Sequence, residues 1–213
     1  MPDQMHEEVE PPKRLDDYEG QARAKSTRLS ILKHAAQLFS SKGYDGCSTR
    51  EIATAAGVSY ANIRYHFGDK DTLWRKVIVF LQTEAYQGNE LLSKMDGGEE
   101  AKHLFRSHTY NAVQYIADRP ELPRIFLFER LAGGPRLAEI EPIIEEIHLD
   151  RVRHIERMQA AGAIRSDIDP ERLNALIAGG LTEKFVVQPV TDQKTRNRLI
   201  DEFTDMIVRL VAN

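Results

Sequence analysis

The chain has 213 residues, of which 41% are hydrophobic and 29% are charged, and its formal net charge is −4. This composition is that of ordinary globular proteins, so it excludes a wholly disordered chain, and the length allows one or two domains with cores of their own. No apolar run approaches the ~20 residues that cross a bilayer, and the N-terminal segment is acidic rather than signal-like, so we expect a cytoplasmic protein.

The charge is unevenly distributed along the chain. Residues 1–20 carry two Lys/Arg against seven Asp/Glu, whereas residues 21–76 carry ten against four, a local net charge of +6. The remainder, 77–213, carries seventeen against twenty-two, a net charge of −5. A short basic segment in an otherwise acidic chain suits attraction to nucleic-acid phosphates. A solvated basic face or a site for an acidic partner remains the alternative.

The apolar pattern predicts helices almost throughout. Residues 1–21 are acidic, contain prolines and lack apolar periodicity, so we expect a disordered tail. A first helix is expected over roughly 22–42, ended by Gly43. The other helices, apart from two short ones treated below, are expected from Asp69 past Leu91, around Leu104 to Ile116, from Ile125 to Leu131, from Leu137 to Gly162, and at roughly 170–187 and 193–211. With no strand alternation, the predicted fold is all-α, with about nine helices.

Two short helices between Cys47 and Trp74 form a helix-turn-helix pattern. Ser48 and Glu51 have the spacing of a capping box, which predicts the start of a helix. Gly57 can take the left-handed conformation that a sharp turn requires, and Ser59 can cap a second helix over residues 60–67. In such a unit the second helix enters the major groove of DNA through its N-terminal half.

The second helix and its neighbours provide the expected DNA contacts. Tyr60, Ala61 and Asn62 are placed to meet base edges, where Asn62 can read adenine and Ala61 can touch a thymine methyl group. Ser59 lies at the same helix end. The other candidates are expected to contact phosphates and set the register on the duplex, and they are Thr49, Arg50, Arg64, Tyr65, His66 and Lys70.

Three short motifs lie at fixed spacing between the first helix and Leu73. The first consists of Phe39, Gly43 and Tyr44; the second is Ile-Ala-x-x-Ala-Gly-Val-Ser at residues 52–59; and the third comprises Tyr65, His66, Phe67, Lys70 and Leu73. In these residues the chain resembles the tetracycline-repressor (TetR) family of bacterial regulators. Gly68 and Asp69 replace the polar pair that is commoner before the lysine.

The resemblance implies a complete architecture and a function. Residues 22–68 are expected to be the DNA-binding domain, and residues 69–213 a ligand-binding and dimerisation domain reached through the fourth helix. The implied protein is a ligand-responsive transcriptional regulator, a repressor that a small organic effector releases from a palindromic operator. The resemblance implies no catalytic activity, and we expect no cofactor.

A homodimer is expected, because a single module contacts too few bases for useful specificity. The last two helices are the expected interface, since they carry small residues and apolar stripes that suit a four-helix bundle. The alternative is that both stripes are buried within one subunit. The interface candidates are Leu173, Ala178, Leu181, Leu199, Phe203, Met206 and Leu210.

The effector site is expected among the middle helices, as the resemblance implies. His108, Asn111 and Tyr115 share a helix face with Leu104, which suits a few polar anchors in an apolar cavity. Phe126, Arg130 and Phe185 complete the expected pocket. Any one of these residues, taken alone, also fits an ordinary core or surface position.

Other functional classes have weaker support. Glu100 with His103 and Glu145 with His148 have the Glu-x-x-His spacing of di-iron helical bundles, a spacing that chance also produces in an acidic chain. No nucleophile elbow or phosphate-cradling glycine loop is present, so we expect neither an enzyme nor a metal site. A ligand-binding protein that lost its DNA affinity is a further alternative. Cys47, the single cysteine, is expected to be structural, with a redox role as the alternative.

Overall fold

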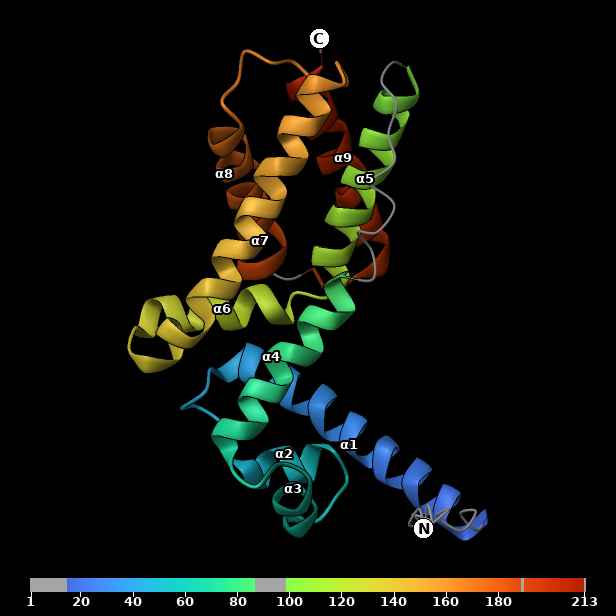
Figure 1. Ribbon diagram of the computed structural model, residues 1–213, viewed down its shortest axis with the longest axis vertical. Helices are drawn as coiled ribbons and strands as arrows, with labels where there is room; N and C mark the ends of the chain where they lie inside the picture. Colours follow the sequence, from blue (N-terminus) through green and yellow to red (C-terminus); the bar gives the residue numbers. More distant parts are fainter. Residues whose placement is uncertain (1–14, 87–98, 189, 213) are drawn as a thin grey trace, which may run out of the picture.

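The protein is described by a computed structural model that covers residues 15–86, 99–188 and 190–212. Over these ranges the chain forms nine α-helices and one π-helix, with no β-strand, so the all-α prediction is confirmed (Figure 1). None of the helices in this part of the chain combines the length and apolar character that a membrane span requires.

Four helices form one end of the molecule. They are α1 (Leu15–Lys42), α2 (Thr49–Ala55), α3 (Tyr60–Phe67) and α4 (Lys70–Tyr86). The expected disordered tail is wrong for residues 15–21, because α1 already begins at Leu15. An acidic segment is compatible with the first turns of a helix, where negative residues stabilise the helix dipole. The expected continuation of the fourth helix past Leu91 lies outside the described residues.

The remaining helices form the other end. They are α5 (Glu99–Asp118), α6 (Glu121–Ala132), α7 (Pro135–Ala160), α8 (Pro170–Leu181), the π-helix η2 (Thr182–Val187) and α9 (Gln193–Val211). The helix α6 begins four residues before the expected Ile125. Pro123 lies in its first turn, where the missing N–H costs no internal hydrogen bond.

Two hydrophobic cores lie one at each end of the molecule. The first is formed by buried side chains of α1 to α4 together with Leu122, Ile125 and Ile140 from α6 and α7. It therefore extends beyond residue 68, where we expected the DNA-binding domain to end. The second core is formed by α5, α7, α8, η2 and α9, with Val113 and Ile164 among its most buried members. Figure 1 shows α6 lying across the junction between the two ends.

The junction is also bridged by ion pairs. Arg75 of α4 donates two hydrogen bonds, at 2.7 and 3.0 Å, to the carboxylate of Glu139 on α7. Arg136, at the start of α7, pairs with Asp45 in the loop between α1 and α2 at 3.1 Å. The same guanidinium pairs with the buried carboxylate of Glu129 on α6. The N-terminal helices are thus fastened to α6 and α7 by polar as well as apolar contacts.

Candidate nucleic-acid interface and effector site

The start of α2 is fixed by the predicted capping box. The Ser48 hydroxyl accepts a hydrogen bond from the Glu51 backbone N–H at 3.2 Å, and the Glu51 carboxylate accepts one from the Ser48 N–H at 2.8 Å. Lys42 Nζ lies 3.0 Å from the same carboxylate. Hydrogen bonds from Lys42, and then from Ser48, lower the pKa of Glu51 to about 2. The carboxylate therefore stays charged and ties the end of α1 to the start of α2.

The turn between α2 and α3 has the conformation that the sequence predicted. Gly57 has φ +67°, the left-handed region that favours glycine, and an added Cβ would meet no atom there. Ser59 Oγ accepts a hydrogen bond from the Asn62 N–H at 3.3 Å and so caps α3. The Ser30 hydroxyl of α1 donates to the Ala56 carbonyl at 3.3 Å, which holds the end of α2 against α1.

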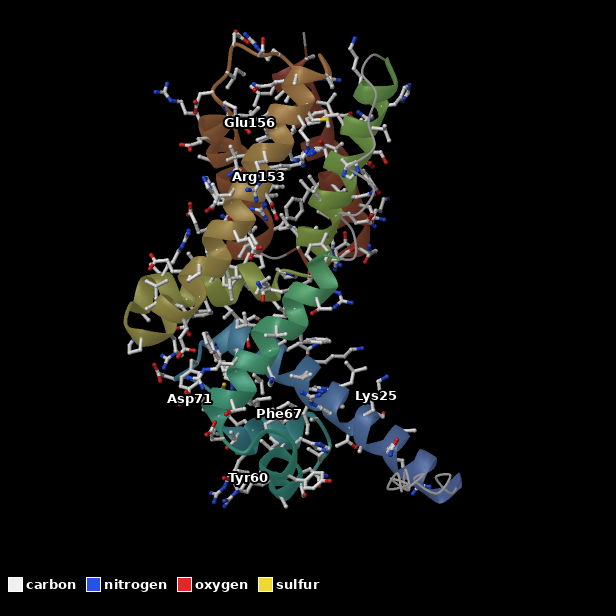
Figure 2. The ribbon with its side chains drawn as sticks, in the orientation of Figure 1. Lys25, Tyr60, Phe67, Asp71, Arg153 and Glu156 are labelled. Atoms are coloured by element: carbon white, nitrogen blue, oxygen red, sulfur yellow. The ribbon has the colours of Figure 1, made fainter. Side chains whose placement is uncertain are left out.

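One face of α3 is buried and the other is open. Ile63 and Phe67 belong to the first core, whereas Tyr60 is 45% and Tyr65 82% exposed. Figure 2 shows Tyr60 at the outer end of the molecule, with Phe67 nearer to α1 and α4. Of the other predicted DNA contacts, Arg50, Ser59, Ala61 and Arg64 are exposed, and Thr49, Asn62, His66 and Lys70 are half-buried.

Lys70 belongs to a cluster around the ring of Tyr44. Its Nζ lies 4.2 Å from the ring centroid, and Cζ of Arg136 lies 3.9 Å from the same centroid. The Tyr44 hydroxyl donates a hydrogen bond to Asp71. Burial, reinforced by Asp71, raises the pKa of Tyr44, so the hydroxyl remains a donor. The cluster fixes the start of α4, where the predicted phosphate contact Lys70 lies.

Cys47 lies in the first core and makes one weak polar contact. Its thiol points to the Tyr44 carbonyl at 3.7 Å. Burial raises the pKa of the thiol, which disfavours the reactive thiolate. These features favour the structural role expected for Cys47.

The six expected pocket residues do not form one cluster. Phe126 packs against the first core, and Phe185 is buried in the second, where its ring centroid lies 5.4 Å from that of Phe203. Arg130 and Asn111 are exposed. The other two residues are half-buried on α5: the Tyr115 hydroxyl donates to the Leu81 carbonyl at 3.5 Å, and His108 lies beside a histidine of α7.

The expected interface residues divide between core and surface. Leu173 and Leu181 are buried in the second core, so they are not on the surface of the subunit. Ala178, Leu199 and Phe203 are half-buried. The exposed apolar side chains on α8, η2 and α9 include Met206 and Leu210 from the expected set, together with Leu176 and Val187.

The two Glu-x-x-His pairs do not converge where the structure describes them. His148 Nδ1 lies 3.0 Å from Asn174 Nδ2, and Glu145 is exposed. The side chain of Glu100 lies outside the described residues. Among the residues that are described, no three His, Cys, Asp or Glu side chains form a group able to hold a metal ion.

Comparison with known sequences identifies the N-terminal helices. Residues 31–77, from α1 through the middle of α4, match the profile described as "Bacterial regulatory proteins, tetR family". This match places the N-terminal helices in the tetR family. The match covers the capping box, the Gly57 turn and the exposed face of α3, so the family is assigned by the segment whose geometry is described above.

The related proteins are regulators and receptors. It is 28% identical to the A-factor receptor protein of Streptomyces griseus over 76% of this chain and 55% of that protein. It is 27% identical to the HTH-type transcriptional regulator RutR of Escherichia coli over 82% of this chain and 81% of that protein. The chain thus spans only about half of the A-factor receptor, and the match to the regulator YttP of Bacillus subtilis covers 28% of that protein.

Solved structures show the same fold along most of the chain. A tetR-family regulatory protein from Rhodococcus RHA1 superposes with a TM-score of 0.65 at 20% identity, covering 87% of this chain and 97% of that one. A gamma-butyrolactone receptor superposes with a TM-score of 0.61 at 18% identity, covering 89% and 100%. The C-terminal helices therefore share the TetR-family fold.

Three polar residues in the second half of the chain were not predicted from the sequence as functional candidates. They are Arg151 and His154 on α7 and Asn174 on α8, of which Asn174 is buried against His148. A sequence signal for Arg151 did exist. An apolar series with steps of three or four residues runs along α7, and position 151 is the one position of that series that is not apolar; the others are Ile144, Ile147, Ile155 and Met158. His154 and Asn174 gave no such signal, because their surroundings come from other helices.

Proposed function

We propose that this protein is a transcriptional regulator that binds duplex DNA through α2 and α3. The observation that carries the proposal is the exposed N-terminal half of α3, which is capped by Ser59 and anchored from behind by Ile63 and Phe67. An exposed helix of this kind fits the major groove, with Asn62 near base edges and Tyr65 near phosphates. The local net charge of +6 over residues 21–76 supplies attraction to the backbone.

The proposal divides the chain between two tasks. Residues 22–68 read DNA, and residues 69–213 bind an effector and a second subunit. The relatives named as receptors for A-factor and for a gamma-butyrolactone support a small organic effector that releases a repressor from its operator. Release requires that the effector bind more tightly to a dimer whose recognition helices do not match adjacent grooves. Such a regulator works in the cytoplasm, beside the chromosome.

The proposed dimer interface lies on α8, η2 and α9. Leu176 is 61% and Met206 53% exposed, and Val187 and Leu210 are exposed as well. Gly180 lies where an added Cβ would be 3.6 Å from the Phe203 ring, so α8 and α9 lie side by side at this point. Two such helices from each subunit can pack as a four-helix bundle. The bundle would place two copies of α3 on one duplex.

The decisive experiment is selection of bound DNA from a random duplex pool with the full-length protein. We expect a palindromic consensus, followed by tight binding that weakens steeply with salt. The control is Arg153→Ala, which removes an exposed cation of α7 outside the proposed DNA and dimer contacts and should leave binding unchanged. No enrichment, together with no binding to random duplex at low salt, would show a ligand-binding protein without DNA affinity. Placing the consensus across a reporter promoter then distinguishes repression from activation.

A further inference from the structure

Arg151 occupies an unusual position on α7. The buried residues of this helix include Val152, Ile155 and Met158, and residue 151 lies one turn from Ile155 on the same face. The Arg151 side chain is nevertheless exposed to solvent. Protein atoms also surround the guanidinium closely enough that loss of hydration lowers its pKa. A cation on an inward face that water still reaches is placed to meet a bound molecule.

No carboxylate in the described part of the chain pairs with Arg151. Three aspartates, one each on α5, α7 and α9, have other partners: Asp118 pairs with Arg196 at 3.1 Å, Asp150 with Arg153 at 2.6 Å and Asp205 with Arg106 at 2.6 Å. Among the groups that the structure describes, none offsets this loss of hydration with an opposite charge. A guanidinium that loses hydration without an anion is unfavourable, and an anion from outside would supply the missing partner.

A second polar group without a partner lies one turn further along α7. His154 Nδ1 is buried and has no hydrogen-bond partner. Its ring centroid lies 5.8 Å from that of His108 on α5, so the two imidazoles bridge α5 and α7. Burial, followed by the charges of His108 and Arg157, lowers the pKa of His154 to about 4, so the ring is neutral at physiological pH. A buried nitrogen without a partner costs stability that a ligand atom can recover.

The surroundings of these groups are apolar. His154 adjoins Ile155 in sequence, and Met158 lies one turn beyond it, both in the second core. The same core contains Phe105 and Val113 of α5, the helix that carries His108. A ligand that pairs with Arg151 and also fills the apolar surroundings has one acidic group and an apolar body. A cationic ligand would repel Arg151, and a neutral one would leave it unpaired.

We propose that the effector is an aliphatic carboxylic acid whose carboxylate pairs with Arg151 and whose head also reaches His154. The assignment rests on the effector site proposed above and specifies its ligand class. It also specifies the bridge that the ligand makes, since Arg151 and His154 lie on α7 and His108 lies on α5. A ligand held between these two helices acts on α7, which Arg75 and Arg136 connect to the DNA-binding end.

The test is calorimetric titration of the full-length protein at pH 7.5. The probes are octanoate, decanoate and dodecanoate, compared with two uncharged ten-carbon molecules, 1-decanol and γ-decalactone. We expect at least one carboxylate to bind, and decanoate to bind about tenfold or more tightly than either neutral probe, because charge-assisted pairing with Arg151 is lost in the latter. The bound carboxylate should also weaken binding to the selected duplex.

Two variants locate the site. Arg151→Gln should weaken carboxylate binding by about tenfold to a hundredfold and leave the neutral probes unaffected. Arg153→Gln is the matched control, because Arg153 is exposed on the same helix (Figure 2) and already pairs with Asp150. This variant should bind carboxylates within about twofold of the wild type. Since Arg151 is unpaired, its replacement should not lower the melting temperature.

Two results would overturn the assignment. One is that none of the carboxylates binds; the other is that the neutral probes bind equally well and Arg151→Gln changes nothing, which would indicate an uncharged effector. Selection of DNA is independent of both results. If a palindromic consensus is selected but no carboxylate binds, only the proposed ligand class is wrong. If carboxylates bind in a way that depends on Arg151 but no DNA consensus is selected, the proposed regulatory function is wrong.

Discussion

The guanidinium of Arg136 stacks on the ring of Tyr44, with 3.9 Å between Cζ and the ring centroid. Arg136 begins α7, whereas Tyr44 lies in the loop that leads into the helix-turn-helix. The same guanidinium pairs with Glu129, a buried carboxylate of α6. One side chain therefore joins three segments that are far apart in sequence, and its removal should affect stability in a way that depends on pH.

Replacing Arg136 with methionine should lower the free energy of unfolding by about 3 kcal/mol at pH 7.5, because it leaves the Glu129 charge buried without a partner. Burial already raises the pKa of Glu129, and loss of Arg136 raises it further. A carboxyl group whose pKa is raised in the folded state destabilises the protein increasingly as the pH rises above the ordinary pKa of about 4.3. The defect should therefore shrink as the pH is lowered toward 5, which urea unfolding at the two pH values measures.

Two variants accompany Arg136→Met. In the double variant Glu129→Gln/Arg136→Met the buried charge is gone, so most of the pH dependence should disappear. Arg153→Met removes an exposed arginine from the same helix and should cost little. A loss of stability in Arg136→Met that is independent of pH would show that stacking on Tyr44, rather than the charge of Glu129, is what Arg136 provides.

Asn62 and Tyr65 should respond differently to alanine. Tyr65→Ala removes an expected phosphate contact and should weaken binding to every sequence in the selected pool. Asn62→Ala should instead relax the preference at one base position of each half-site and cost about 1–3 kcal/mol of binding free energy on the consensus. Binding curves on the consensus and on point-substituted duplexes separate the two effects. If Tyr65→Ala changed base preference and Asn62→Ala did not, the roles would be reversed.

Met206→Glu should convert the dimer to monomers. Met206 is exposed in the single subunit, so the substitution should leave folding intact and place a charge in the proposed bundle. The control is Val79→Glu, since Val79 is 54% exposed on α4, away from α8 and α9. Light scattering after gel filtration gives the mass of both variants. A dimer that survived both Met206→Glu and Leu176→Glu would place the interface elsewhere.

His154 should make the protein sensitive to acid. Its pKa is lowered to about 4, well below the ordinary value of about 6.5, so the unfolded state binds a proton more readily between these values. Stability should therefore fall as the pH drops from 6.5 to 4, with a contribution from His154 of about 2–3 kcal/mol. His154→Gln should lack that contribution in urea unfolding at pH 7 and pH 4.5, and the exposed His103→Gln is the matched control. Equal losses in wild type and His154→Gln would contradict a buried neutral imidazole.

Local signals in the sequence were enough to predict the helix-turn-helix. Ser48 with Glu51, Gly57 and Ser59 act within a few residues of themselves, through caps and a left-handed turn, so their roles are visible without the rest of the fold. The starts of α8 and α9 and the end of α9 were also predicted, whereas the single helix expected over 170–187 divides at Thr182 into α8 and η2. The predicted start of α1 was wrong because an acidic segment is compatible with both a disordered tail and a first helical turn.

The effector half was harder to predict from the sequence, because its features arise from contacts between helices. His108 was recognised as unusual from its own helix face, but its neighbour His154 lies 46 positions away in sequence and is brought close only by packing of α7. Leu173 and Leu181 look like interface residues by their spacing, yet both are buried within the subunit. An apolar stripe shows that a helix has a buried face and does not show which neighbour covers it.

Ile125 of α6 and Ile140 of α7 belong to the first core, which limits how the molecule can be divided. A fragment that stops at the end of α4 would carry the complete reading unit but would leave the side chains of α1 that pack on α6 facing water. Such a fragment should associate or precipitate rather than act as a miniature regulator. A chimera that exchanges DNA preference with another family member therefore needs to carry α6 and the first turns of α7 along with the donor's first four helices.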